Sequence, residues 1–332
     1  MNLYFFLNTL ITLLLSAGLF SKNFKTIFFL LSVLLISFNI LIFSHSSAQD
    51  HVVTMNSFEQ DDLFFEPLFT IITKFLFLFL PSEFVLAATF LFVSLTAFAL
   101  IERNLKNVLF VILLLQFQTG LISVRIFLAI IIGGLAIFSL SKIKKYTAAV
   151  AAPLFHSATI IILPIVILDR LKNFQSFIYF LAVIFFIIIL IGEINIRELL
   201  VNFALYIGRD YSYYLSAGIG SDGALSIFSI IKFLLPIIFI LICTRFQINV
   251  FLFLAIFAFL IKVLLWEFEP LSRITNTLLI ISVCYLTTLD INKNLASFFV
   301  LFYCLALNFS LFFESDTVTS LKFYFEGLSV VF

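Results

Sequence analysis

The sequence predicts an all-α fold, a polytopic membrane-embedded helical bundle of about 10–12 transmembrane segments. Two observations lead to this prediction. Of the 332 residues, 63% are hydrophobic and only 11% are charged, whereas a soluble domain carries about 25% charged residues. The chain also contains repeated apolar runs of about 18 residues or more, the length that a helix needs to cross a bilayer. We expect a single transmembrane domain over residues 1–332.

The expected segments follow one another with short connectors. The apolar runs lie near residues 2–20, 26–43, 65–81, 83–101, 107–123, 125–141, 146–168, 173–191, 225–243, 249–266, 274–290 and 295–313. No basic segment precedes the first run, so we interpret it as an uncleaved span and not as a signal peptide.

The charges of the connectors predict how these runs cross the membrane, because short loops rich in Lys and Arg face the cytoplasm. The basic connectors hold Lys22/Lys25, Arg103/Lys106, Lys142/Lys144/Lys145, Arg170/Lys172, Arg245 and Lys293. The loop 44–64 has acidic residues and no Lys or Arg, so we expect it outside, together with the loop 193–224. If all twelve runs crossed, two basic connectors would also lie outside.

Two re-entrant segments, at 65–81 and 146–168, remove this conflict and leave ten full spans. Each contains proline and polar residues: Pro67 and Lys74 in the first, and Pro153, His156 and Pro164 in the second. Such residues are tolerated at membrane depth where the backbone faces protein or a water-filled cavity.

Composition also excludes some functions. A net charge of +1 gives no electrostatic reason to expect a nucleic-acid partner. Cys243, Cys284 and Cys304 lie inside apolar runs without metal-ligand spacing, which is typical of small buried side chains. We therefore expect no metal site and no cofactor.

Three arginines are expected on the outer side, although Lys and Arg are favoured in cytoplasmic loops. They therefore need a partner there, and an anionic ligand is one candidate. Arg125 is either an interfacial residue that reaches the headgroups or a guanidinium that binds phosphate or pyrophosphate. The same alternatives hold for Arg273. Arg209 has Asp210 as its neighbour, so a local ion pair and a ligand contact are both open.

Two further candidates lie at the predicted re-entrant segments. Glu66 precedes Pro67, where a carboxylate complements a helix dipole; it could instead bind or deprotonate an acceptor. His156 is either a hydrogen-bonded packing residue or a group that accepts a proton or binds phosphate.

The stretch "YSYYLSAGIGSDGALS" (211–226) is the most polar external segment. Its hydroxyls and aromatic faces suit a sugar, although an ordinary loop uses the same residue types. The candidate sugar or acceptor contacts here are Tyr211, Tyr213, Tyr214 and Asp222.

The order of these motifs resembles a known family. Asp50, "EPLF" (66–69), Arg125-x-x-x-Ala129, "KIKK" and "LFHSA" (154–158) follow one another as in the EpsG-like, Wzy-type polymerases of bacterial surface polysaccharide. The resemblance is densest over 45–170 and continues more weakly in "YSYY" and "SRIT". Thr54 stands where the family has a tyrosine four residues after the aspartate, and Ile126 where it often has glutamine.

The resemblance implies a glycosyltransferase of the bacterial inner membrane that acts on the periplasmic side. It would transfer a glycan from undecaprenyl pyrophosphate to the non-reducing-end sugar of the next lipid-linked repeat unit. The partners are these lipid-linked donor and acceptor oligosaccharides, membrane lipid and, where the pathway has one, a chain-length regulator. The implied catalytic residues are His156, Glu66 and Asp50, and the implied pyrophosphate ligands are Arg125, Arg273 and Arg209.

Other functions remain open at this point. A lipid-phosphate-sugar-dependent glycosyltransferase would use Asp61 and Asp62 with a metal ion. An O-antigen ligase would share the donor of the polymerase. A flippase or other transporter is expected to have two matching halves, and the sequence shows no internal repeat.

Overall fold

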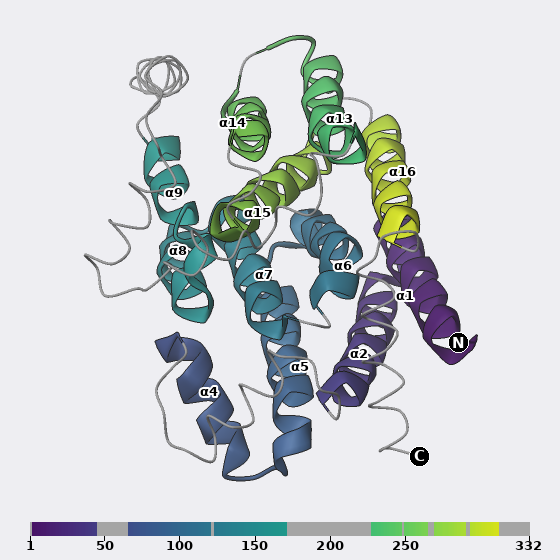
Figure 1. Ribbon diagram of the computed structural model, residues 1–332, viewed down its shortest axis with the longest axis vertical. Coiled ribbons are helices and arrows are strands. Elements are labelled where there is room, and N and C mark those ends of the chain that lie inside the picture. Colours follow the sequence, from purple (N-terminus) through teal and green to yellow (C-terminus); the bar gives the residue numbers. More distant parts are fainter. Residues whose placement is uncertain are drawn as a thin grey trace. The chain divides into compact units, whose positions relative to one another are not determined.

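In the computed structural model of the protein, the described residues are 2–44, 66–120, 123–170, 227–247, 249–264, 269–289 and 293–311. Within these ranges the regular secondary structure is helical and no strand occurs (Figure 1). The all-α prediction is therefore confirmed for this part of the chain. The expected run 173–191 and nearly all of the expected loops 44–64 and 193–224 lie outside the described residues.

The helices begin and end close to the predicted apolar runs. They are α1 (Asn2–Phe20), α2 (Lys25–Ser44), α4 (Pro67–Phe77), α5 (Ser82–Leu100), α6 (Lys106–Gly120), α7 (Val124–Phe138), α8 (Lys142–Phe155), α9 (Ile162–Arg170), α13 (Ile227–Cys243), α14 (Val250–Leu264), α15 (Glu269–Leu286) and α16 (Lys293–Leu311), with 3₁₀ turns η1 (Arg103–Leu105) and η2 (Ser157–Thr159). By length and composition alone, α2 and α5 are the two described helices long and apolar enough to cross a membrane.

The chain divides into two compact units, 1–166 with 283–332, and 167–282. In the first unit α6 and α7 pack against each other, and α1, α5, α8 and α16 pack around them. Almost every residue of α7 is buried, which makes this helix the centre of the unit. In the second unit α13 packs against α14, and the Ser282 Oγ of α15 donates a hydrogen bond to the carbonyl oxygen of Phe251 at 3.3 Å.

Three basic connectors of the first unit meet at one end, which we call the basic end (Lys22, Lys25, Arg103, Lys106, Lys142, Lys144 and Lys145). Lys25 Nζ donates a hydrogen bond to Asn107 Oδ1. Ser139 Oγ bonds to Glu102 Oε1 at 3.2 Å, and Lys144 Nζ donates to the carbonyl oxygen of Leu100 at 2.5 Å. The turns after α1, α5 and α7 therefore lie together.

The opposite end of the unit holds the segment that includes α4. Ser44 Oγ, at the end of α2, donates a hydrogen bond to the carbonyl oxygen of Glu83, at the start of α5, at 3.0 Å. The chain between them consequently leaves and returns at the same end. With 11 residues, α4 is about 17 Å long, well short of the ~30 Å hydrocarbon core of a bilayer.

The predicted segment 146–168 is also interrupted. α8 ends at Phe155, His156 is extended with φ −163° and ψ 126°, and η2 follows. Beyond η2, Ile162 lies against the middle of α7, because a Cβ built on Gly133 would come within 2.2 Å of Ile162 Cδ1. Since α8 runs away from the basic end and Gly133 lies two turns inside α7, the chain turns back along α7 after His156.

Candidate functional site

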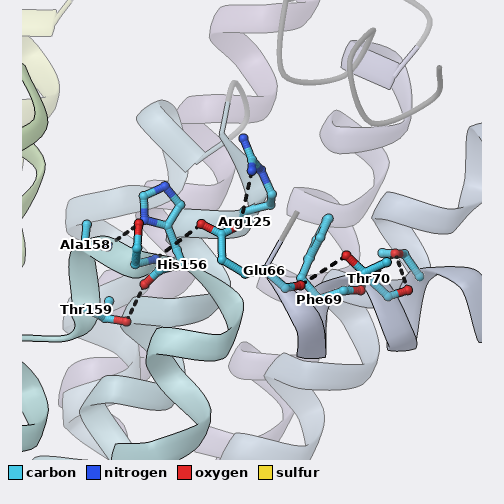
Figure 2. Close-up of polar contacts among 9 residues, drawn as sticks. Glu66, Phe69, Thr70, Arg125, His156, Ala158 and Thr159 are labelled. Atoms are coloured by element: carbon cyan, nitrogen blue, oxygen red, sulfur yellow. Dashed lines mark hydrogen bonds and ion pairs between the residues drawn. The ribbon is translucent and has the colours of Figure 1, made fainter. Parts of the chain in front are cut away.

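Three segments that are far apart in the sequence meet opposite the basic end. Glu66 precedes the first turn of α4, Arg125 is the second residue of α7, and His156 lies between α8 and η2. Figure 2 shows these side chains close together. We call Glu66, Arg125 and His156 the polar junction.

The local sequence at Glu66 explains why its carboxylate is available to other segments. Pro67 starts α4 because its missing N–H and fixed φ suit the first helical position. The Glu66 backbone is non-helical, and its side chain makes no capping hydrogen bond to its own helix. Its carbonyl oxygen accepts hydrogen bonds from the N–H and the hydroxyl of Thr70, both at 3.1 Å. The backbone is thus fixed while the carboxylate points away from α4.

The Glu66 carboxylate joins the other two segments. Its Oε2 accepts a hydrogen bond from Arg125 Nη1 at 3.2 Å, and its Oε1 accepts one from the backbone N–H of Ser157 at 3.3 Å. The two charged side chains are only 9% and 16% exposed. A buried charge requires a partner, because its desolvation is costly. The carboxylate therefore fixes the start of α7 and the start of η2 relative to each other.

Backbone contacts orient the ring of His156. Its Nδ1 accepts a hydrogen bond from the N–H of Ala158 at 3.1 Å, and its carbonyl oxygen accepts from the Thr159 hydroxyl at 2.8 Å and N–H at 3.0 Å. A backbone N–H is always a donor, so Nδ1 carries no proton in this arrangement. The proton of the neutral ring is then on Nε2, which makes this nitrogen a hydrogen-bond donor.

The junction combines one guanidinium, one buried carboxylate and one imidazole. A guanidinium has five N–H donors in a planar arrangement that matches the oxygens of a phosphate, and Glu66 bonds to Nη1 of Arg125. An imidazole Nε2–H adds a neutral donor. This set of groups is chemically suited to bind an anion whose charge grows during a reaction.

The other predicted site residues lie in the second unit or outside the described residues. Arg273 lies in α15 of the second unit, where its side chain is exposed and its carbonyl oxygen accepts a hydrogen bond from the Thr277 hydroxyl at 3.0 Å. The predicted residues that lie outside the described part of the chain are Asp50, Arg209, Tyr211, Tyr213, Tyr214 and Asp222.

Sequence reasoning missed the backbone groups of η2. The N–H groups of Ser157 and Ala158 bond to Glu66 and His156, so they orient both side chains. The available signal was local: Pro153 close before His156, with Ser157 and Thr159 after it. Proline and short hydroxyl residues often accompany a helix break.

Comparison with known proteins gives one match. The sequence profile of the EpsG family matches residues 42–325, a range that includes all three residues of the polar junction. No curated protein and no solved structure matches the chain.

Removing the Glu66 carboxylate should destabilise the protein. In Glu66→Ala the Arg125 charge loses its partner and the Ser157 N–H loses its acceptor, and such a loss costs roughly 3–5 kcal/mol at buried sites. The thermal midpoint of the purified protein in detergent measures this effect. Glu83→Ala is the matched control, because Glu83 forms no ion pair within the described residues; it should cost less than about 1 kcal/mol. Equal midpoints for the two variants would contradict the bridging role of Glu66.

Proposed function

Since the chain belongs to the EpsG family, we propose that it polymerises a bacterial surface polysaccharide such as an O-antigen, capsule or exopolysaccharide. The family indicates a polysaccharide-polymerase-like membrane protein that works with lipid-linked precursors. The more specific proposal is a glycosyltransferase of the bacterial inner membrane. It takes a glycan from undecaprenyl pyrophosphate and joins it to the non-reducing-end sugar of the next lipid-linked repeat unit.

The observation that supports this reaction is the polar junction. During transfer an acceptor hydroxyl oxygen bonds to the anomeric carbon, the bond from that carbon to the pyrophosphate oxygen breaks, and the hydroxyl proton is lost. Undecaprenyl pyrophosphate leaves as a stable anion, so arginine can stabilise it and no strong acid is needed. We assign this role to Arg125, whose guanidinium is held by Glu66 at 3.2 Å.

The roles of the other two residues follow from their contacts. Both Glu66 oxygens accept hydrogen bonds, so Glu66 positions Arg125 and η2. Since Nδ1 of His156 accepts the Ala158 N–H, His156 donates from Nε2 to a pyrophosphate oxygen. Asp50, outside the described residues, is then the candidate to receive the proton of the acceptor hydroxyl.

The remaining site residues extend the same proposal. Arg273 and Arg209 are further contacts for the pyrophosphate. Tyr211, Tyr213, Tyr214 and Asp222 bind the sugars of donor or acceptor through hydroxyl groups, a carboxylate and aromatic faces. No metal ion is required, because arginines supply the positive charge that the leaving group needs.

Connector charges and the path of the chain support a membrane orientation. Three basic connectors meet at one end of the first unit, and basic connectors face the cytoplasm as a rule. The polar junction lies at the other end of the unit, which supports the proposal that the reaction takes place on the periplasmic side. In this orientation each of the segments 65–81 and 146–168 enters and leaves the membrane on the same side. The proposed single domain 1–332 then has ten full spans.

Substitution of Arg125 tests the proposed reaction. Arg125→Lys keeps a positive charge but loses the planar donors, and we expect at least about 100-fold less polymer, with single-repeat lipid product still present. Gel separation of the polysaccharide by chain length measures this result. Arg245→Lys is the matched control because Arg245 is exposed in the turn after α13. A normal chain-length ladder in Arg125→Lys would refute the assignment.

Two variants of His156 separate a hydrogen-bond donor from a general base. Glutamine can donate from Nε2 but cannot accept a proton as imidazole does, so His156→Gln should stay within about tenfold of wild-type polymer. His156→Ala removes the donor and should lose roughly 100-fold. The same assay measures both. Equal loss in the two variants would assign His156 to proton transfer instead.

Cysteine labelling tests the orientation. Single cysteines at Arg103, Lys142 and Lys172 should react with a membrane-impermeant reagent from the cytoplasm, and one at Pro81 from the outside. The native Cys243, Cys284 and Cys304 are buried and should give little background. If Lys172 and Arg103 were labelled from opposite sides, the segment 146–168 would be a full span and this orientation would be wrong.

A further inference from the structure

The cations of the basic end fall into two groups, of which the first is neutralised within the chain. Lys144 Nζ lies 3.7 Å from Glu102 Oε1 and also donates to the Leu100 carbonyl oxygen. Burial by itself raises the pKa of the Glu102 carboxyl, but backbone hydrogen bonds, the Ser139 hydroxyl and the Lys144 charge together hold it below its ordinary value. Glu102 thus stays ionised at neutral pH and offsets the charge of Lys144.

Within the described part of the chain, the second group, Lys25, Arg103 and Lys106, has no such counter-charge. Lys25 Nζ bonds to the side chain of Asn107, the residue after Lys106, and Arg103 begins the turn η1 that leads directly to Lys106. Among the described residues no carboxylate forms an ion pair with any of the three. Like charges at short range repel one another. A bound anion would offset the repulsion among these three cations.

Two contacts with uncharged groups hold this group in place. Lys25 Nζ donates to Asn107 Oδ1, and Lys106 Nζ lies 3.9 Å from the centre of the Phe98 ring. Both contacts leave the charge in place, since an amide oxygen and an aromatic face are neutral partners. The side chains of Lys25 and Lys106 are therefore pre-organised without being neutralised, which is the property of a binding site.

We propose that Lys25, Arg103 and Lys106 bind the phosphate of an anionic phospholipid headgroup. A phosphate has several acceptor oxygens for ammonium and guanidinium donors. Phe24 and Ile27, beside Lys25 at the start of α2, are 58% and 52% exposed, so acyl chains can lie against them. The site is at the opposite end of the unit from the polar junction, and it does not depend on the proposed polymerase reaction.

Lipid binding by the purified full-length chain tests this site. The protein in detergent is titrated with phosphatidylglycerol or phosphatidylcholine, and native mass spectrometry counts the bound lipids. We expect wild type to bind phosphatidylglycerol preferentially, and the variant Lys25→Gln, Arg103→Gln, Lys106→Gln to bind it about tenfold more weakly. The control variant Lys22→Gln, Lys142→Gln, Lys145→Gln removes the same charge from the same end and should stay within about twofold of wild type.

Three results would overturn the proposal. Equal loss in the two triple variants would mean that only the overall charge of the basic end attracts lipid. Equal binding of the two lipids by wild type would mean that the site does not recognise anionic headgroups. Displacement of phosphatidylglycerol by millimolar inorganic phosphate would mean that the site takes free phosphate instead.

A milder variant covers the case in which the triple variant does not fold. Asn107→Ala removes the acceptor that holds Lys25 and keeps all three charges. It should weaken phosphatidylglycerol binding about threefold, with a thermal midpoint close to that of wild type. Unchanged binding in Asn107→Ala would contradict the pre-organised site.

Discussion

The ion pair between Glu66 and Arg125 is the interaction on which the candidate site depends. Both charges are largely buried, so each offsets the cost of removing the other from water. The second Glu66 oxygen bonds the backbone of η2, which brings a third segment to the same point. As a result α4, the start of α7 and the break after α8 are held at one place, although none of them is adjacent in the sequence.

The helices could be predicted from the sequence more fully than the contacts of the polar junction. Composition and apolar runs predicted the helices, because membrane helices satisfy their backbone hydrogen bonds within one segment. Prolines and His156, which interrupt the apolar runs, predicted that the helices at 65–81 and 146–168 would be interrupted. The Glu66–Arg125 pair was not predicted. From the sequence, Glu66 was interpreted as complementing a helix dipole and Arg125 as binding an anionic ligand. A pairing across 59 residues depends on how α4 and α7 pack, which no local pattern records.

The two ends of the first unit show two ways of handling charge. At the polar junction a positive side chain is held by a carboxylate, and a backbone N–H orients the His156 ring. At the basic end, an amide oxygen and an aromatic ring hold Lys25 and Lys106, and no carboxylate among the described residues pairs with them or with Arg103. The first arrangement suits an anion that forms during a reaction. The second suits an anion that stays bound.

The most direct test of the central claim is polymerisation by the purified chain in lipid vesicles. The substrate is an undecaprenyl-pyrophosphate-linked repeat unit, supplied as both donor and acceptor with a metal chelator present. We predict products of many repeat units and one undecaprenyl pyrophosphate released for each bond formed. Transport of the intact lipid-linked unit without a new glycosidic bond, or transfer only to a different acceptor, would contradict the account.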